Sequence, residues 1–191
     1  MKFTIFFFSF MLLMSVQRVW ETFLRKDEKK EGHIIHKWTL FALSSVHITI
    51  GILTVLEYFI VNRSINYIIT ILGIILYLCS FFLRKWAIKT LGEFHSIHIE
   101  IRDHQQIIKK GPYKYLRHPY YLSVMLELVG FPLVPNAYYA FCFAVFVYIP
   151  LVVVRLYLEE NAMIEEFGEE YLIYKQETKG LMPFSKTRPI K

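Results

Sequence analysis

Five long apolar blocks constrain this chain more than any other feature of its sequence. They are too long for the strands of a soluble core, and short polar or charged stretches separate them. A bilayer core takes roughly 20 helical residues, a length that the second, third and fifth blocks reach. The five blocks run over residues 3–19, 38–61, 67–88, 120–134 and 137–157.

The composition also indicates a polytopic membrane protein. Of the 191 residues, 55% are hydrophobic and 20% are charged, whereas a soluble domain usually has about 45–50% and about 25%. An ordinary soluble enzyme, a disordered chain and a disulfide scaffold are excluded. The net charge is +6, and the charged residues flank the apolar blocks. We therefore expect the chain to contact membrane lipids and not nucleic acid. Cys79 and Cys142 lie within the blocks and are expected to be small buried hydrophobic residues.

The positions of lysine and arginine predict an orientation. Segments 21–37 and 84–118 and the C-terminal tail hold almost all the positive charge, while the connection 62–66 holds only Arg63. Positive connections stay in the cytoplasm. The sequence therefore predicts an all-α, multi-pass membrane protein of about five transmembrane helices, with the N-terminus outside and the C-terminus cytoplasmic.

The first block has a second interpretation, a secretory signal peptide, because Lys2 precedes the apolar run. The stretch Ser15-Val16-Gln17-Arg18 offers no small-residue cleavage site of the usual kind. We therefore expect a retained first helix.

The sequence predicts two halves. Residues 1–88 hold three transmembrane helices, and residues 89–191 form a catalytic half with an extended cytoplasmic segment, a transmembrane helical hairpin and a C-terminal amphipathic helix. The stretch Pro132–Asn136 is too short for anything but a tight turn, which is why the hairpin is expected. The polar segments 89–118 and 158–191 then meet on the cytoplasmic side, where we place the chemistry.

Polar residues inside or beside the blocks have more than one interpretation. His47, Glu57 and Glu127 are isolated within apolar blocks, and each should face another helix and not lipid. Arg155 and Glu159 are four residues apart at the end of the last block. They could form a plain surface ion pair, but a charge at such depth is costly and is usually functional.

The histidines near residue 97 do not predict a metal site. A metal cluster needs more ligands than the chain supplies beside His95 and His98, so no metal is expected. The alternation of apolar and polar residues over 96–102 instead predicts an extended interfacial segment that presents His98, Glu100 and Arg102 on one side. The sequence also lacks any Gly-x-Gly, so a Rossmann fingerprint and a P-loop are both missing.

The stretch Gly111–Tyr121 is the densest in polar and aromatic residues. It could be only a collar at the membrane surface, with Pro119 in the first turn of a helix. Alternatively, unpaired N–H groups at this helix start, together with Arg117 and His118, form a site for an anionic group. Composition leaves both interpretations open.

Taken in order, these elements resemble a known family. They are Gly111-Pro112-Tyr113, Arg117-His118-Pro119-x-Tyr121, a helical hairpin, Arg155-x-x-x-Glu159-Glu160, and Phe167-Gly168-x-x-Tyr171-x-x-Tyr174. The pattern is similar to that of the isoprenylcysteine carboxyl methyltransferase family, integral membrane methyltransferases related to phospholipid N-methyltransferases. The likeness covers about residues 91–184.

The resemblance implies S-adenosyl-L-methionine as cofactor and a lipophilic or lipidated acceptor that enters from the bilayer. By family, the acceptor is a prenylcysteine carboxylate. The short chain looks like the prokaryotic members, which would place it in a cytoplasmic membrane, and another lipid-borne carboxylate, phenol or enol is equally possible there. Carried over by position, Arg155 would be the catalytic, substrate-facing residue. The cofactor-binding residues would be His98, Gln105, Gln106, Ile107, Ile108, Tyr113, His118, Pro119, Tyr121 and Glu159.

Two other functions remain open. Membrane sterol reductases share a similar C-terminal helical half but use a nicotinamide cofactor. A small non-catalytic scaffold, whose charges only fix its topology, is the second alternative.

Overall fold

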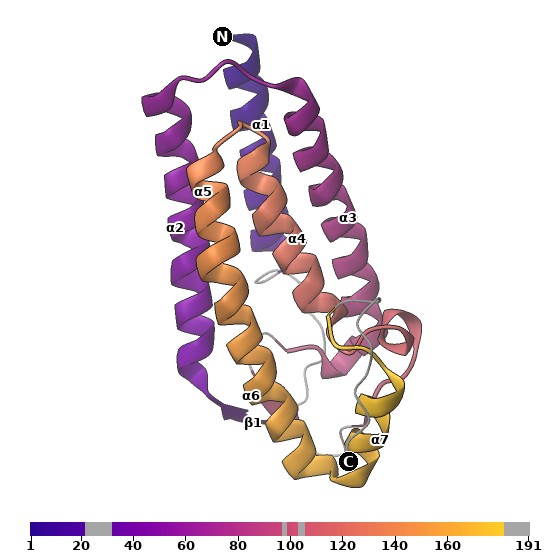
Figure 1. The fold of residues 1–191 in the computed structure, drawn as a ribbon. Helices are drawn as coiled ribbons and strands as arrows, with labels where there is room; N and C mark the ends of the chain where they lie inside the picture. The colour runs from indigo at the N-terminus through magenta and orange to yellow at the C-terminus, as the bar shows by residue number, and fades with distance from the viewer. Residues whose placement is uncertain (22–31, 97–98, 103–105, 182–191) are drawn as a thin grey trace.

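The computed structural model describes residues 1–21, 32–96, 99–102 and 106–181, and this part of the chain is mostly helical (Figure 1). The apolar blocks form the long helices of one bundle. The helices are α1 (Lys2–Val19), α2 (Lys37–Val61), α3 (Tyr67–Leu91), η2 (Gly92–Phe94), η3 (Gly111–Lys114), α4 (Pro119–Leu133), α5 (Tyr138–Phe143), η4 (Ala144–Tyr148), α6 (Ile149–Phe167) and α7 (Glu169–Glu177).

Three helices of the bundle are long and apolar enough to cross a membrane. They are α2, the α3–η2 helix Tyr67–Phe94, and the continuous helix Tyr138–Phe167 that joins α5, η4 and α6. Large apolar side chains cover their outer faces: Phe41 and Ile68 are each 77% exposed. Lipid, and not water, suits such a surface, so the chain is a membrane protein. Five spans remain a prediction, because α1 and α4 are not among the three.

Helices α3 and α4 pack closely through two glycines. A Cβ atom added at Gly73 would lie 2.8 Å from the carbonyl oxygen of Gly130, and one added at Gly130 would lie 2.9 Å from that of Gly73. Small residues at such a crossing let two helix backbones approach in lipid, where van der Waals packing drives association.

Glu57 and Glu127 face other helices, as the sequence predicts. Glu57, on α2, accepts hydrogen bonds from the backbone N–H groups of Tyr139 (3.1 Å) and Ala140 (2.9 Å), and so caps the start of α5. It also pairs with Arg63 at 3.1 Å. Glu127, on α4, binds arginines of α1 and α3, which are described with the second cavity below.

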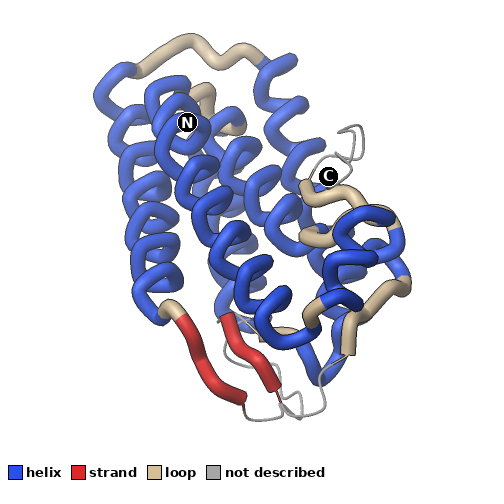
Figure 2. Tube along the Cα trace, turned by 60° about the horizontal axis from the view of Figure 1, so that its bottom comes forward, coloured by secondary structure: helices blue, strands red, loops and turns tan. Residues whose placement is uncertain are grey.

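A small two-stranded sheet lies at the end of the bundle opposite the N-terminus (Figure 2). Strand β1 (Gly32–Ile35) pairs antiparallel with β2 (Ile99–Arg102), with Gly32 opposite Arg102 and Ile35 opposite Ile99. The predicted extended segment is therefore present from residue 99, although the all-α prediction missed this pairing. The sheet holds the two positively charged connections together at one end of the molecule.

The prediction that both cysteines are buried is wrong. Cys79 and Cys142 are exposed on the surface of the bundle. Their apolar surroundings in the sequence do not decide burial, because lipid is as apolar as the interior of a helical bundle.

Candidate active site

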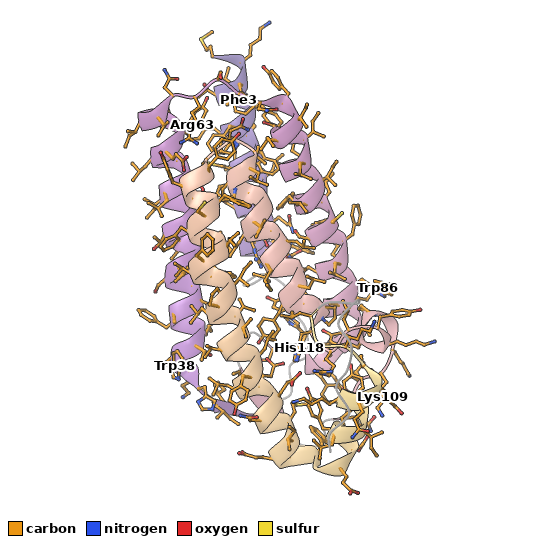
Figure 3. All side chains as sticks on the ribbon, in the orientation of Figure 1. Phe3, Trp38, Arg63, Trp86, Lys109 and His118 are labelled. Atoms are coloured by element: carbon orange, nitrogen blue, oxygen red, sulfur yellow. The ribbon has the colours of Figure 1, made fainter. Side chains whose placement is uncertain are left out.

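A pocket opens at the sheet end of the bundle, where segments far apart in the sequence meet around the start of α4. Figure 3 shows His118 there, between the end of α3 and the helix α6. The walls come from the region of η2 and β2, from residues 106–113, from the start of α4, and from α6 and α7. They combine aromatic faces, aliphatic side chains and two carboxylates, Glu100 and Glu159.

Most of the residues carried over as cofactor ligands line this pocket: Gln106, Ile107, Ile108, Tyr113, His118, Tyr121 and Glu159. Pro119 is fully buried at the first turn of α4 and forms no part of the walls. His98 and Gln105 lie outside the described residues. The placement of these side chains agrees with their proposed role but does not test it.

The carboxylate of Glu160, a residue to which the sequence assigned no role, holds His118. Glu160 Oε1 lies 3.0 Å from His118 Nε2 and accepts a hydrogen bond of 2.8 Å from Arg117 Nε. Its Oε2 lies 2.7 Å from Lys175 Nζ on α7. The other ring nitrogen of His118, Nδ1, is 3.9 Å from Glu159 Oε1. Glu160 therefore fixes the imidazole so that its second nitrogen faces the pocket carboxylate.

Arg117 does not serve the anion site that the sequence suggested. Its backbone N–H donates to the carbonyl of Lys179 at 2.7 Å, and that of His118 donates to Gly180 at 3.3 Å. Its guanidinium binds Glu160 and the carbonyls of Lys175 (3.0 Å) and Thr178. The chain's own acceptors thus occupy these donors, and Arg117 ties the segment after α7 to the start of α4.

Tyr121 connects the two residues that the sequence placed on one helix face. Its hydroxyl donates to Glu159 Oε2 at 2.5 Å and accepts from Arg155 Nε at 2.8 Å. Arg155 Nη1 also donates to Thr39 Oγ1 at 2.8 Å. Arg155 is only 3% exposed and stands behind Tyr121, outside the lining of the pocket. In this arrangement the hydroxyl of Tyr121 links Arg155 to Glu159.

Three tyrosines give the pocket neutral, aromatic walls. Burial raises the pKa of Tyr113 and of Tyr171 well above the usual value, and it raises the pKa of Tyr174 to about 12. The hydroxyl of Tyr174 donates to the carbonyl of Tyr113 at 2.7 Å. These rings therefore keep their protons near pH 7 and present uncharged faces.

Sequence reasoning missed several lining residues. Those from the end of α3 through β2 and those on α6 and α7 had no assigned role. Tyr171 and Tyr174 did carry a signal, because they stand in the last element of the family pattern. The additional lining residues include His95, Ser96, Glu100, Tyr120, Ala162, Met163, Tyr171 and Tyr174.

Comparisons with known proteins agree with this pattern. Residues 71–165 match the model of the isoprenylcysteine carboxyl methyltransferase (ICMT) family. An uncharacterized protein of Bacillus subtilis, YpbQ, is 37% identical over 83 residues, which cover 43% of this chain and 49% of that protein. Protein-S-isoprenylcysteine O-methyltransferase B of Arabidopsis thaliana is 33% identical over 105 residues, which cover 53% of each chain. The matches thus span about half the length of these relatives.

A solved structure shows the same fold. The eukaryotic intramembrane Ras methyltransferase ICMT superposes with a TM-score of 0.59 at 23% identity, over 79% of this chain and 54% of that chain. At this identity the likeness concerns the fold alone. The family match, by contrast, includes the start of α4, the helical hairpin and the Arg155–Glu160 element. Over residues 71–165 the chain therefore resembles the isoprenylcysteine carboxyl methyltransferase family.

Proposed function

We propose that this protein is an S-adenosylmethionine-dependent methyltransferase that acts on the carboxylate, or on an acidic hydroxyl, of a lipophilic substrate. By family, the substrate resembles a prenylcysteine. One observation carries the proposal: a single pocket at the end of an apolar bundle gathers residues 106–108, Tyr113, His118, Tyr121 and Glu159 from separate segments of the chain.

The chemistry of the walls suits the cofactor. S-adenosylmethionine supplies an electrophilic methyl group on a sulfonium when it is bound. Glu159, whose side chain is 29% exposed, is suited to an ammonium group or to ribose hydroxyls. Tyr113 and Tyr121 offer aromatic faces to an adenine or a cation, and Ile107 and Ile108 add apolar surface.

The chain needs to position the reactants more than to move protons. A carboxylate or an acidic enol is already an anion near pH 7, so its methylation requires no general base. Alignment of two reactants can contribute up to roughly 7–11 kcal/mol. Arg155, linked to the pocket through Tyr121, is the cation that we assign to orienting the acceptor.

Calorimetric titration of the purified protein tests this function. We expect S-adenosylmethionine to bind and NADPH not to bind. Binding of NADPH alone would support a nicotinamide-dependent reductase, and binding of neither would support a scaffold. Either result would overturn the proposal.

Glu159→Ala should weaken the binding of S-adenosylmethionine by about tenfold or more, because a charge-assisted hydrogen bond contributes roughly 1.5–3 kcal/mol. The measurement is cofactor affinity by titration in detergent. Glu165→Ala is the matched control, since Glu165 is exposed on the same helix and should leave the affinity unchanged. Wild-type affinity in the Glu159 variant would show that this residue does not bind the cofactor.

We also propose that the sheet end of the bundle is cytoplasmic, because its connections hold most of the lysines and arginines. Residue 64 lies in the connection between α2 and α3, at the opposite end of the bundle from the sheet (Figure 1). Reporters fused at residues 64 and 191 should therefore report opposite sides of the membrane, with residue 191 inside. If both reporters lay on the same side of the membrane, the chain would cross it one time fewer than predicted between residues 64 and 191.

A further inference from the structure

A second cavity lies between α1, α2 and α4. Its lining shares no described residue with the lining of the candidate active site. On α4 it begins near Glu127, whereas the first pocket ends at Tyr121. Six to seven helical residues correspond to about 10 Å along the axis, so the second cavity lies deeper in the apolar part of the bundle.

Two contacts of α1 bound the cavity along the helix. Near the N-terminus, the ring of Phe7 lies 5.1 Å from that of Tyr58. At the other end, Arg18 Nε donates to Glu127 Oε1 at 3.0 Å. Between these contacts the facing wall is α2, where a Cβ atom added to Gly51 would meet no atom within 4 Å. The gap between α1 and α2 is therefore open space.

The charged groups beside the cavity cancel one another. Arg18 and Arg84 both bind Glu127, with Arg18 Nη2 lying 2.5 Å from Glu127 Oε2. Arg84 Nε also lies 2.9 Å from Glu21 Oε2. Two arginines thus balance two glutamates. A charged head group added here would be unbalanced at a depth where a lone charge is expensive.

Two polar side chains still offer hydrogen bonds to a ligand. Arg18 gives two of its five N–H donors to Glu127, lines the cavity, and has a side chain that is 23% exposed. His47 also lines it. Within the described part of the chain, no hydrogen bond is formed by the ring nitrogens of His47, which makes an edge contact with Tyr148 at 6.5 Å.

A hydroxyl group matches this pair. Its oxygen accepts from the Arg18 guanidinium, and its proton is donated to a nitrogen of neutral His47. The apolar walls then determine which kind of molecule can bear this hydroxyl. Met11, Met14 and Phe131 line the cavity, and thioether sulfur and aromatic side chains both make favourable contacts with an aromatic ring.

We propose that this cavity binds an uncharged lipophilic phenol, with the hydroxyl between Arg18 and His47 and the ring between α1 and α4. The site is separate from the methyl-transfer pocket. This proposal does not depend on whether the protein transfers methyl groups to the same compound.

Photolabelling of the full chain in phosphatidylcholine nanodiscs tests the site. The probe is 4-nonylphenol with a diazirine in its alkyl chain, and labelled peptides are mapped by mass spectrometry. We expect saturable labelling of the α1 and α2 peptides that contain Met14 and Ile48. Unlabelled 4-nonylphenol should compete about tenfold better than nonylbenzene or 4-nonylbenzoate, because neither of these keeps both hydrogen bonds of an uncharged hydroxyl.

Two variants and a control complete the test. Gly51→Phe fills the space and should abolish the saturable labelling, while His47→Phe should weaken it about tenfold. Ile52→Phe is the matched control, because Ile52 is the next residue on α2, is 55% exposed and lines neither cavity. Thermal unfolding verifies that each variant is folded. Labelling spread over the outer helix faces, equal competition by 4-nonylbenzoate, or unchanged labelling in folded His47→Phe would overturn the proposal.

Discussion

Arg155→Ala should reduce methyl transfer to below roughly one hundredth of the wild-type rate while it leaves S-adenosylmethionine binding largely intact. Loss of a single preorganised donor at a reacting centre costs about 10²–10³ in rate. Arg155 is 3% exposed, and its guanidinium donates to the hydroxyls of Tyr121 and Thr39. It lies outside the pocket lining, so its loss should affect the acceptor more than the cofactor.

The measurement is transfer of a labelled methyl group into an extractable lipid fraction, with cofactor affinity determined in parallel. Arg155→Lys should also lose much of the activity, because an ammonium cannot reproduce the planar fork that grips a carboxylate at two points. Thr39→Val is the control. It keeps the cation and removes only the hydroxyl on α2, so most of the activity should remain. If Arg155→Ala transferred methyl groups at the wild-type rate, Arg155 would not orient the acceptor.

The helices could be predicted from the sequence because their signal is local. An apolar run of known length specifies a membrane helix wherever it lies in the chain. The turn between α4 and α5 is similarly short and local, with Ala137 N–H donating to the carbonyl of Pro132 at 2.8 Å. The pairing of β1 with β2 joins two separate connections, and neither strand's pattern indicates its partner.

Burial was less predictable than helix position. In a soluble protein an apolar neighbourhood in the sequence usually means a place in the core. Here lipid replaces water around the outer faces, so Cys79 and Cys142 are exposed although they stand among apolar residues. Polar residues were better guides. A carboxylate within an apolar helix needs a partner on another helix, and Glu57 and Glu127 both have one.

Most of the residues named from the motifs line one pocket, but the contacts among them could not be predicted. Tyr121 and Glu159 were identified as neighbours in function, and their hydrogen bond of 2.5 Å brings them together in space. The partners of Arg117 are instead Glu160, Lys175 of α7 and Thr178 after α7, which no local pattern connects to it. His98 and Gln105 lie outside the described residues and stay predictions.

Glu127→Ala should destabilise the folded bundle by about 3–5 kcal/mol, the usual cost of removing one partner from a buried ion pair. Glu127 is 1% exposed and binds both Arg18 of α1 and Arg84 of α3. Arg84 is itself fully buried. The variant therefore leaves Arg18 without this carboxylate and Arg84 with only Glu21 among its described ion-pair partners. Thermal unfolding in detergent measures the loss, and Glu170→Ala, on the exposed face of α7, is the control.

A double variant separates the cost of an unpaired charge from the loss of packing. Arg18→Met combined with Glu127→Met removes both members of one ion pair and keeps apolar volume, while Arg84 retains Glu21. Replacing a buried pair by apolar residues of similar size is often neutral or stabilising. We therefore expect the double variant to recover most of the stability that Glu127→Met loses, because Glu127→Met keeps the volume but leaves Arg18 without this carboxylate. A double variant as unstable as Glu127→Met would show that Glu127 acts through Arg84, and that the contact with Arg18 does not hold α1 in place.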